Sequence, residues 1–127
     1  MNKNLALTSF LGALAVALGA FGAHSLQETL SITELNSFET AVHYQMYHVI
    51  VLFFVNTYSK FNNKTKNTIS YFFFVGILFF SGSIYAITFG ISAKNIWFIT
   101  PLGGLLFIIG WLKMVIVFFK AKDNNLK

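Results

Sequence analysis

The sequence predicts an all-α fold, an integral membrane four-helix bundle, and three observations support this prediction. The 127 residues are 56% hydrophobic and only 10% charged, which is more apolar surface than a soluble domain of this size can bury. Four apolar segments approach the roughly 20 helical residues needed to cross a hydrocarbon core of about 30 Å. Their apolar runs are continuous rather than alternating, which favours helices over the strands of a barrel. We expect a single transmembrane domain, residues 1–127, with spans near residues 5–23, 41–58, 69–91 and 100–119.

The first span is rich in small residues, among them Gly12, Ala15 and Gly19. Their spacing of three and four predicts a groove that a neighbouring backbone can approach closely, as helix pairs in lipid require. Lys3, the apolar run and the small residues near Ala23 also resemble a signal peptide. The run is long for a signal peptide, so we expect a retained helix.

The second span has a helix-start signal well before its apolar part. Ser31 and Glu34 form a capping box, after which Leu35, Phe38 and Val42 recur on one helical face. We therefore expect this helix to begin outside the bilayer core, with an amphipathic outer turn along the membrane surface.

In the third span, Gly82, Ala86 and Gly90 repeat at a spacing of four, which predicts another close-packing face. The Ser81–Ser83 stretch around Gly82 either bends this helix or only permits close packing, and both alternatives stay open.

The fourth span offers Gly103 and Gly110, seven residues apart, for close packing. Thr100 and Pro101 predict an N-cap followed by proline at the first helical position, and Trp97 fits the aromatic belt at a membrane interface.

The lysines predict the orientation of the bundle. One connection and the two termini are basic, whereas the first connection has three glutamates and the third only Lys94. The positive-inside rule then places both termini and the KFNNKTKN loop, residues 60–67, in the cytoplasm. Lys113 lies inside the last span, about two turns from its cytoplasmic end, and we interpret it as a snorkelling anchor. The lysines on the cytoplasmic side are Lys3, Lys60, Lys64, Lys66, Lys120, Lys122 and Lys127.

The stretch AVHYQMYH, residues 41–48, carries most of the polar chemistry in the spans. Residues four apart share a helical face, whereas residues five apart differ by about 140°. Glu39, His43 and Tyr47 therefore form one stripe, and Tyr44 with His48 forms another, so the two histidines do not share a metal ion in the HExxH manner. His24 ends the first span on the same side of the membrane. The candidate polar cluster is His24, Tyr44, His48, Ser81 and Ser83, with Glu39, His43 and Tyr47 as a second-rank interface cluster.

Four interpretations of this cluster compete. A metal or haem site has imidazoles but no convergent ligand set, and the absence of cysteine excludes c-type haem attachment. A proton, ion or quinone path could use His24, Tyr44 and His48, since ionisable groups within spans are costly. A hydrolase could pair Ser25 or Ser81 with a histidine, but no motif supports one. The fourth interpretation, hydrogen bonds that tie the helices together at about 0.6 kcal/mol each, is the simplest and the one we favour.

Four motifs occur in order along the chain: GAFGAHSL, then Phe38, Ala41, Val42, Tyr44 and His48, then GILFFSGSIY, then TPLGGLLFIIGW. With these motifs the sequence resembles the YgdD/YwdK-like family of small four-helix membrane proteins, a domain of unknown function, over residues 9–111. The resemblance implies an integral membrane protein and supplies no activity. Other residues in these motifs are Ser81, Gly82, Ser83, Tyr85, Thr100, Pro101, Gly103, Gly104 and Trp111.

We therefore expect a multi-pass protein of the bacterial inner membrane that is not an enzyme and acts as a structural or accessory component. The expected partners are membrane lipid and either further copies of the chain or a larger membrane complex, with no nucleic acid, metal or cofactor. The alternative is a small transporter, or a proton- or quinone-handling element, with a His/Tyr pocket between the first, second and third helices. An enclosed, water-reachable cavity would favour transport, and fully hydrogen-bonded side chains would favour the structural role.

Overall fold

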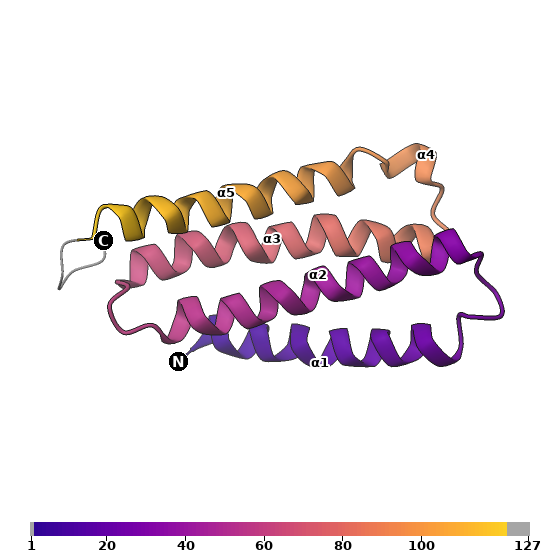
Figure 1. Ribbon diagram of the computed structural model, residues 1–127, viewed down its shortest axis with the longest axis horizontal. Coiled ribbons are helices and arrows are strands. Elements are labelled where there is room, and N and C mark those ends of the chain that lie inside the picture. Colours follow the sequence, from indigo (N-terminus) through magenta and orange to yellow (C-terminus); the bar gives the residue numbers. More distant parts are fainter. Residues whose placement is uncertain (1, 122–127) are drawn as a thin grey trace.

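The computed structural model describes residues 2–121, which form four long helices and one short one (Figure 1). Lys122 and Lys127, which the topology prediction also used, lie outside the described residues. The all-α, four-helix prediction is confirmed. The helices are α1 (Lys3–His24), α2 (Ile32–Thr57), α3 (Asn63–Thr88), the single-turn α4 (Ala93–Ile96) and α5 (Ile99–Phe119).

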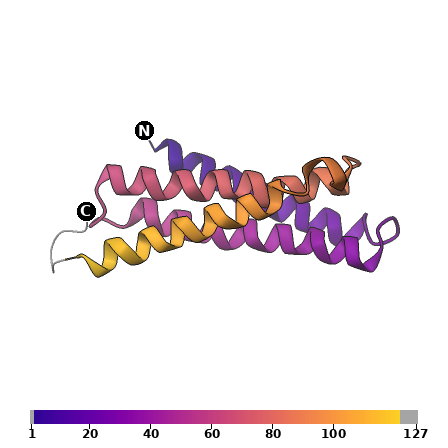
Figure 2. The same cartoon turned by 90° about the horizontal axis from the view of Figure 1, so that it is seen from above.

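The long helices stack in chain order, each reversing direction from the one before (Figure 1). α2 packs against α1 on one side and α3 on the other, and α3 makes the most extensive contact, with α5. In the view turned by 90°, α5 runs obliquely across α3 (Figure 2). α1 and α5 are therefore the outer helices, and α2 and α3 form the centre.

Three helices in the described part of the chain are long and apolar enough to cross a membrane: α1, α3 and α5. α2 is long enough, since its 26 residues extend about 39 Å, but it is not apolar enough to meet the same standard. Its polar residues, including His43, Gln45 and His48, lower its apolar character. The expected fourth crossing therefore stays a prediction.

The small face predicted for α1 packs against α2. A Cβ added at Gly12 would lie 3.3 Å from Val49, one at Gly19 would lie 3.4 Å from Val42, and Ala15 is completely buried. At Gly22 an added Cβ would come within 2.7 Å of the Phe38 ring. The absence of side chains on this face is what lets α2 lie so close, as the sequence predicted.

The glycines of α5 serve the same purpose against α3. An added Cβ at Gly103 would overlap the backbone of Phe80, and one at Gly110 would lie 2.6 Å from the Phe73 ring. In return, Gly76 of α3 leaves room for the Phe107 ring of α5. The prediction of close packing at Gly103 and Gly110 is confirmed.

The end of α3 differs from the sequence prediction. The helix stops at Thr88 rather than near Ile91, and Gly90 lies beyond it with a φ of 116°. The Gly90 N–H donates to the Ile87 carbonyl and the Ile91 N–H to the Ala86 carbonyl, which is the Schellman pattern. Gly90 therefore ends the helix, because glycine adopts a positive φ without steric cost. At Gly82 the atoms nearest to an added Cβ belong to Ile77 and Leu78 of α3 itself, so the predicted close-packing face is not formed there.

The two predicted helix starts have different outcomes. At α2 the capping box is present: Ser31 Oγ accepts from the Glu34 N–H at 3.2 Å and the Glu34 carboxylate accepts from the Ser31 N–H at 3.3 Å. The helix then continues unbroken into the bundle, and its outer turns do not form a separate surface segment, because Phe38 is fully buried there.

At the start of α5 the prediction was wrong. The N-cap is Phe98, so Thr100 is the second helical residue and Pro101 the third. Proline is tolerated here because the first four N–H groups of a helix lack intrahelical partners in any case. The Thr100 hydroxyl is hydrogen-bonded to Ser83 of α3 and does not cap its own helix.

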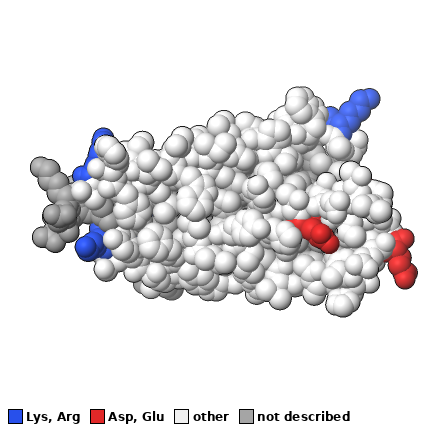
Figure 3. Space-filling view, in the orientation of Figure 1, with Lys and Arg blue, Asp and Glu red and all other residues white. Residues whose placement is uncertain are grey.

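Charged side chains lie at the two ends of the molecule (Figure 3). Both ends of the described chain and the α2–α3 connection are at one end, which carries Lys3, Lys60 and Lys64. The opposite end has the α1–α2 connection and the start of α2, with Glu28 and Glu34. The apolar middle lies between these two charged ends.

Candidate functional site

Gln45 is one of the most deeply buried polar residues of the bundle, with 1% of its surface exposed. Its amide nitrogen donates to the Leu11 carbonyl of α1 at 2.7 Å, and its amide oxygen accepts from the Tyr85 hydroxyl of α3 at 2.7 Å. The Leu11 carbonyl can only accept, which fixes the orientation of the amide. One side chain of α2 thus connects three helices.

His48 lies one turn further along α2 and is 5% exposed. Its Nδ1 is 2.7 Å from the Tyr44 carbonyl oxygen and its Nε2 is 3.1 Å from the indole Nε1 of Trp111 on α5. An indole N–H can only donate and a carbonyl can only accept, so Nε2 is the acceptor and Nδ1 carries the proton. The two partners therefore define a neutral Nδ1–H tautomer that uses both ring nitrogens.

The His48 ring is also enclosed by aromatic side chains. It stacks on Phe107 of α5 with ring centroids 3.7 Å apart and planes 6° apart, and the Phe73 ring of α3 lies 5.2 Å away. None of the four cavities of about 360 to 580 Å³ that we identify among residues 2–121 is lined by His48. The imidazole is thus packed on its faces and hydrogen-bonded at its edge.

The other predicted cluster residues serve separate contacts. Ser81 is fully buried and its hydroxyl donates to the Ala41 carbonyl of α2 at 2.7 Å, not to a histidine. Ser83 is hydrogen-bonded to Thr100 of α5, while the Tyr44 ring stacks on Phe80 at 4.8 Å and is 40% exposed. α3 runs as a helix through both serines, so the stretch around Gly82 is no turn. The hydrogen bonds join neighbouring helices and do not converge on one point.

His24 lies apart from this group. It is the exposed last residue of α1, and Gly22 beside it packs against Phe38 of α2. Tyr44 and His48 lie six and ten residues beyond Phe38, about 9 and 15 Å along the helix. The helix register therefore excludes the predicted pocket shared by His24, Tyr44 and His48.

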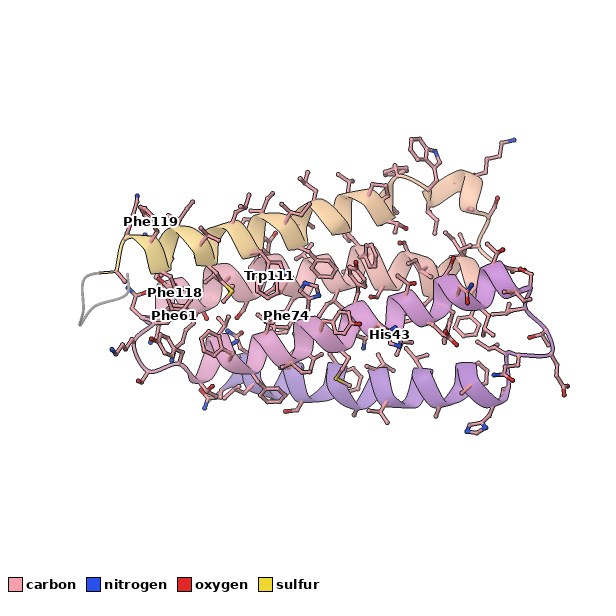
Figure 4. All side chains as sticks on the ribbon, viewed as in Figure 1. His43, Phe61, Phe74, Trp111, Phe118 and Phe119 are labelled. Carbon is pink, nitrogen blue, oxygen red and sulfur yellow. The ribbon has the colours of Figure 1, made fainter. Side chains whose placement is uncertain are left out.

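The second-rank cluster lies on the outside of α2, as the helical spacing predicted. Glu39, His43 and Tyr47 are all exposed, and the His43 and Tyr47 rings are stacked 6.2 Å apart. Figure 4 shows His43 well separated from Trp111, the partner of His48. Within residues 2–121, no group of three or more His, Cys, Asp or Glu residues is arranged to hold a metal ion.

Sequence reasoning missed Gln45 and a group of asparagines, and it noted Trp111 as a motif residue without predicting its contact with His48. Asn56 of α2 donates to the Ser70 hydroxyl of α3 at 2.8 Å and accepts from Asn4 of α1 at 2.9 Å. A signal was present, because Gln45, His48 and Asn56 follow each other along one face of α2 at helical spacing. The hydrogen-bonding groups on this face are the Ala41 carbonyl, Gln45, His48, the Leu52 carbonyl and Asn56.

An apolar groove of about 360 Å³ lies beside this polar face, between α1 and α3. Leu7, Leu11 and Leu14 of α1 form one wall, and Phe74 and Leu78 of α3 form the other. Gln45 and Tyr85 also line the groove. The groove exists because α1 packs chiefly against α2 and leaves its side toward α3 open.

The comparisons with known proteins agree with this architecture. A family model described as a protein of unknown function, DUF423, matches residues 18–104. The chain belongs to this family. A UPF0382 membrane protein of Haemophilus influenzae is 41% identical over 96% of the chain and 98% of its own length. UPF0382 membrane proteins of Staphylococcus saprophyticus and of Staphylococcus aureus strain bovine RF122 are 45% and 44% identical, each over 87% of the chain, covering 94% and 93% of the relatives.

Membership of the DUF423 family confirms the resemblance noted in the sequence and makes the chain a bacterial multi-pass membrane protein. No solved structure matches the chain. The family description assigns no activity.

Proposed function

We propose that this DUF423 protein is a structural or accessory component of the bacterial inner membrane, without enzymatic activity, that assembles with further copies of itself or with a larger membrane complex. Its partners are membrane lipid and protein, not nucleic acid. Both termini lie in the cytoplasm. The central observation is that the polar side chains inside the bundle are used to hold helices together.

The hydrogen bonds of α2 carry this proposal. In the part of the chain that the structure describes, no buried side-chain nitrogen or oxygen lacks a hydrogen-bond partner. His48, the strongest candidate for proton transfer, has both nitrogens occupied by Tyr44 and Trp111. A transport path would need an open polar cavity at this ring, whereas Phe107 and Phe73 pack against it.

The outer face of α1 supports assembly with another protein. Its inner face is covered by α2, while Ala6, Ala13, Ala17 and Ala20 are exposed on the other side. Ala13 and Ala17 are four residues apart, the spacing at which small residues let helices in lipid approach closely. α1 thus has small residues on two faces, one of which is occupied within the bundle.

Affinity purification in mild detergent tests the proposal. The tagged protein should co-purify with a defined partner, or run as an oligomer in size-exclusion chromatography with light scattering. The double variant Ala13→Leu/Ala17→Leu should lose that partner while its Tm stays unchanged, because both positions are exposed. Ile108→Phe/Val115→Phe enlarges exposed residues of α5 and serves as the matched control. A monomer that carries no protein, together with a His48 ring that titrates by NMR, would contradict the proposal and favour transport.

A further inference from the structure

A polar cavity of about 580 Å³ lies at the end of the molecule where α1 and α3 begin. Residues lining it include Lys3 and Asn4 of α1, Asn56 of α2, and Lys66 and Asn67 of α3. It contrasts with the apolar groove between α1 and α3, since most of its lining side chains are amides or ammonium groups. Nothing in the proposed assembly uses this cavity.

The hydrogen-bond network of the asparagines leaves donors at the cavity. The Leu52 carbonyl can only accept, so the Asn56 nitrogen is the group that faces it, at 2.9 Å. The Asn56 oxygen must then accept from the Asn4 nitrogen, which also donates to the Asn67 oxygen at 3.0 Å. The Asn67 NH₂ group is left without a hydrogen-bond partner within residues 2–121, so it can donate to a ligand.

The charge of the cavity selects an anion. Lys3 and Lys66 line it from two helices, and both helices begin here, so the positive ends of their dipoles add to the field. The glutamates Glu28, Glu34 and Glu39 lie toward the opposite end. Ammonium and amide N–H groups together are the donors that bind phosphate oxygens.

The position of the cavity favours a lipid headgroup as the source of that phosphate. Leu5, which also lines the cavity, begins the continuous apolar part of α1. The cavity therefore lies at the level where the helix leaves the hydrocarbon core, which is the level of lipid headgroups.

We propose that this cavity binds the phosphate group of an anionic phospholipid headgroup, with Lys3, Lys66 and the Asn67 amide as its donors. The site would fix one lipid at the junction of α1, α2 and α3. It is independent of protein assembly, because its residues lie at the end of α1 and not on the exposed alanine face.

Native mass spectrometry of the full chain in detergent, with added phosphatidylglycerol or phosphatidylcholine, tests this site. The wild type should retain phosphatidylglycerol preferentially. Lys3→Gln/Lys66→Gln should lower its association constant about thirtyfold at low salt, at roughly 1 kcal/mol for each lysine. Asn67→Ala, which keeps all charges, should also weaken retention of phosphatidylglycerol. Phosphatidylcholine, whose choline cation opposes the lysines, should bind weakly to the wild type and to every variant.

The matched control is Lys60→Gln/Lys64→Gln, which removes the same charge from the same end of the molecule at two exposed residues that do not line the cavity. It should keep most of the phosphatidylglycerol preference. Equal losses in both double variants would show a general charge effect and overturn the site. Equal retention of both lipids by the wild type would overturn it as well, as would saturation by inorganic phosphate with no lipid preference.

Discussion

Trp111 determines what the His48 ring can do. Because its N–H must donate, it holds Nε2 as an acceptor, and the Tyr44 carbonyl then holds the proton on Nδ1. A proton arriving from elsewhere would have to displace one of these two partners. At the scale of single residues, the histidine therefore belongs with Gln45 and Asn56 as a connector between helices.

We expect Trp111→Phe to destabilise the bundle by about 1 kcal/mol, because the Nε2 acceptor of His48 loses its donor while most aromatic packing remains. Thermal unfolding in detergent measures this loss. In a double-mutant cycle with His48→Phe, the coupling energy should reach about 0.6 to 1.7 kcal/mol. Trp97→Phe is the control, since Trp97 is 67% exposed. Additive effects of the two substitutions would show that the indole and the imidazole do not depend on each other.

The sequence indicated which α2 residues share a face but not which neighbour each face meets. Tyr44 and His48 were correctly placed on a stripe separate from His43, because helical spacing alone decides that. The pairing with His24 failed because it depends on the register between α1 and α2, which one sequence does not specify. Gln45 was missed because the role of a buried amide depends on its two hydrogen-bond partners, and these lie on other helices.

At the scale of helices, glycines set how closely α3 and α5 approach. Gly103 and Gly104 are adjacent, yet only Gly103 faces the backbone of Phe80. An added Cβ at Gly104 would meet the Phe80 ring at 3.9 Å, an ordinary contact. The neighbouring residues thus offer a direct comparison between a glycine that packing requires and one that it does not.

Gly103→Ala should lower stability by about 1 to 3 kcal/mol, because the two helices must separate to admit the methyl group. Gly104→Ala should be neutral or stabilise the protein by up to about 1 kcal/mol, because alanine favours a helix over glycine. Thermal unfolding of both variants in the same detergent provides the comparison. Equal Tm values for the two would contradict the packing that we describe.

Helix boundaries were predicted correctly where the hydrogen bonds that set them involve only neighbouring residues in the sequence. The Ser31–Glu34 capping box needs only four residues and was predicted correctly. The start of α5 was not, because the Thr100 hydroxyl is engaged by Ser83, which is 17 residues away in the chain. The end of α3 was misplaced because a glycine can either pack against a neighbouring helix or end its own helix. The positive φ of Gly90 distinguishes the second case, and the sequence does not show it.

At the scale of the whole molecule, the lysines and glutamates of residues 2–121 lie toward opposite ends (Figure 3). The exceptions among them are Lys94, in the α3–α5 connection near the glutamates, and the partly buried Lys113 within α5. The positive-inside rule then favours the end with the termini as the cytoplasmic one. The absence of native cysteine makes this testable without background labelling.

Single cysteines at Gln27 and Asn95 should react with a membrane-impermeant maleimide in intact cells, because both residues are exposed in the connections at the glutamate end. Ser59→Cys, exposed in the α2–α3 connection, should react only after the membrane is opened. A maleimide reagent of large mass slows the labelled protein on a gel, so the shifted band measures the labelling of each variant. The reverse pattern would invert the topology and leave the fold unchanged.

The two ends of the described chain lie at the same end of the bundle (Figure 1), which requires an even number of membrane crossings. Three helices are apolar enough to be recognised as spans, and an odd number of crossings would separate the termini. The fourth crossing that we predict is α2, whose polar face is hydrogen-bonded to neighbouring helices. With α2 as the predicted fourth crossing, the number of crossings becomes even. Hydropathy does not recognise α2, because Gln45, His48 and Asn56 lower its apolar character, although each is hydrogen-bonded to a neighbouring helix.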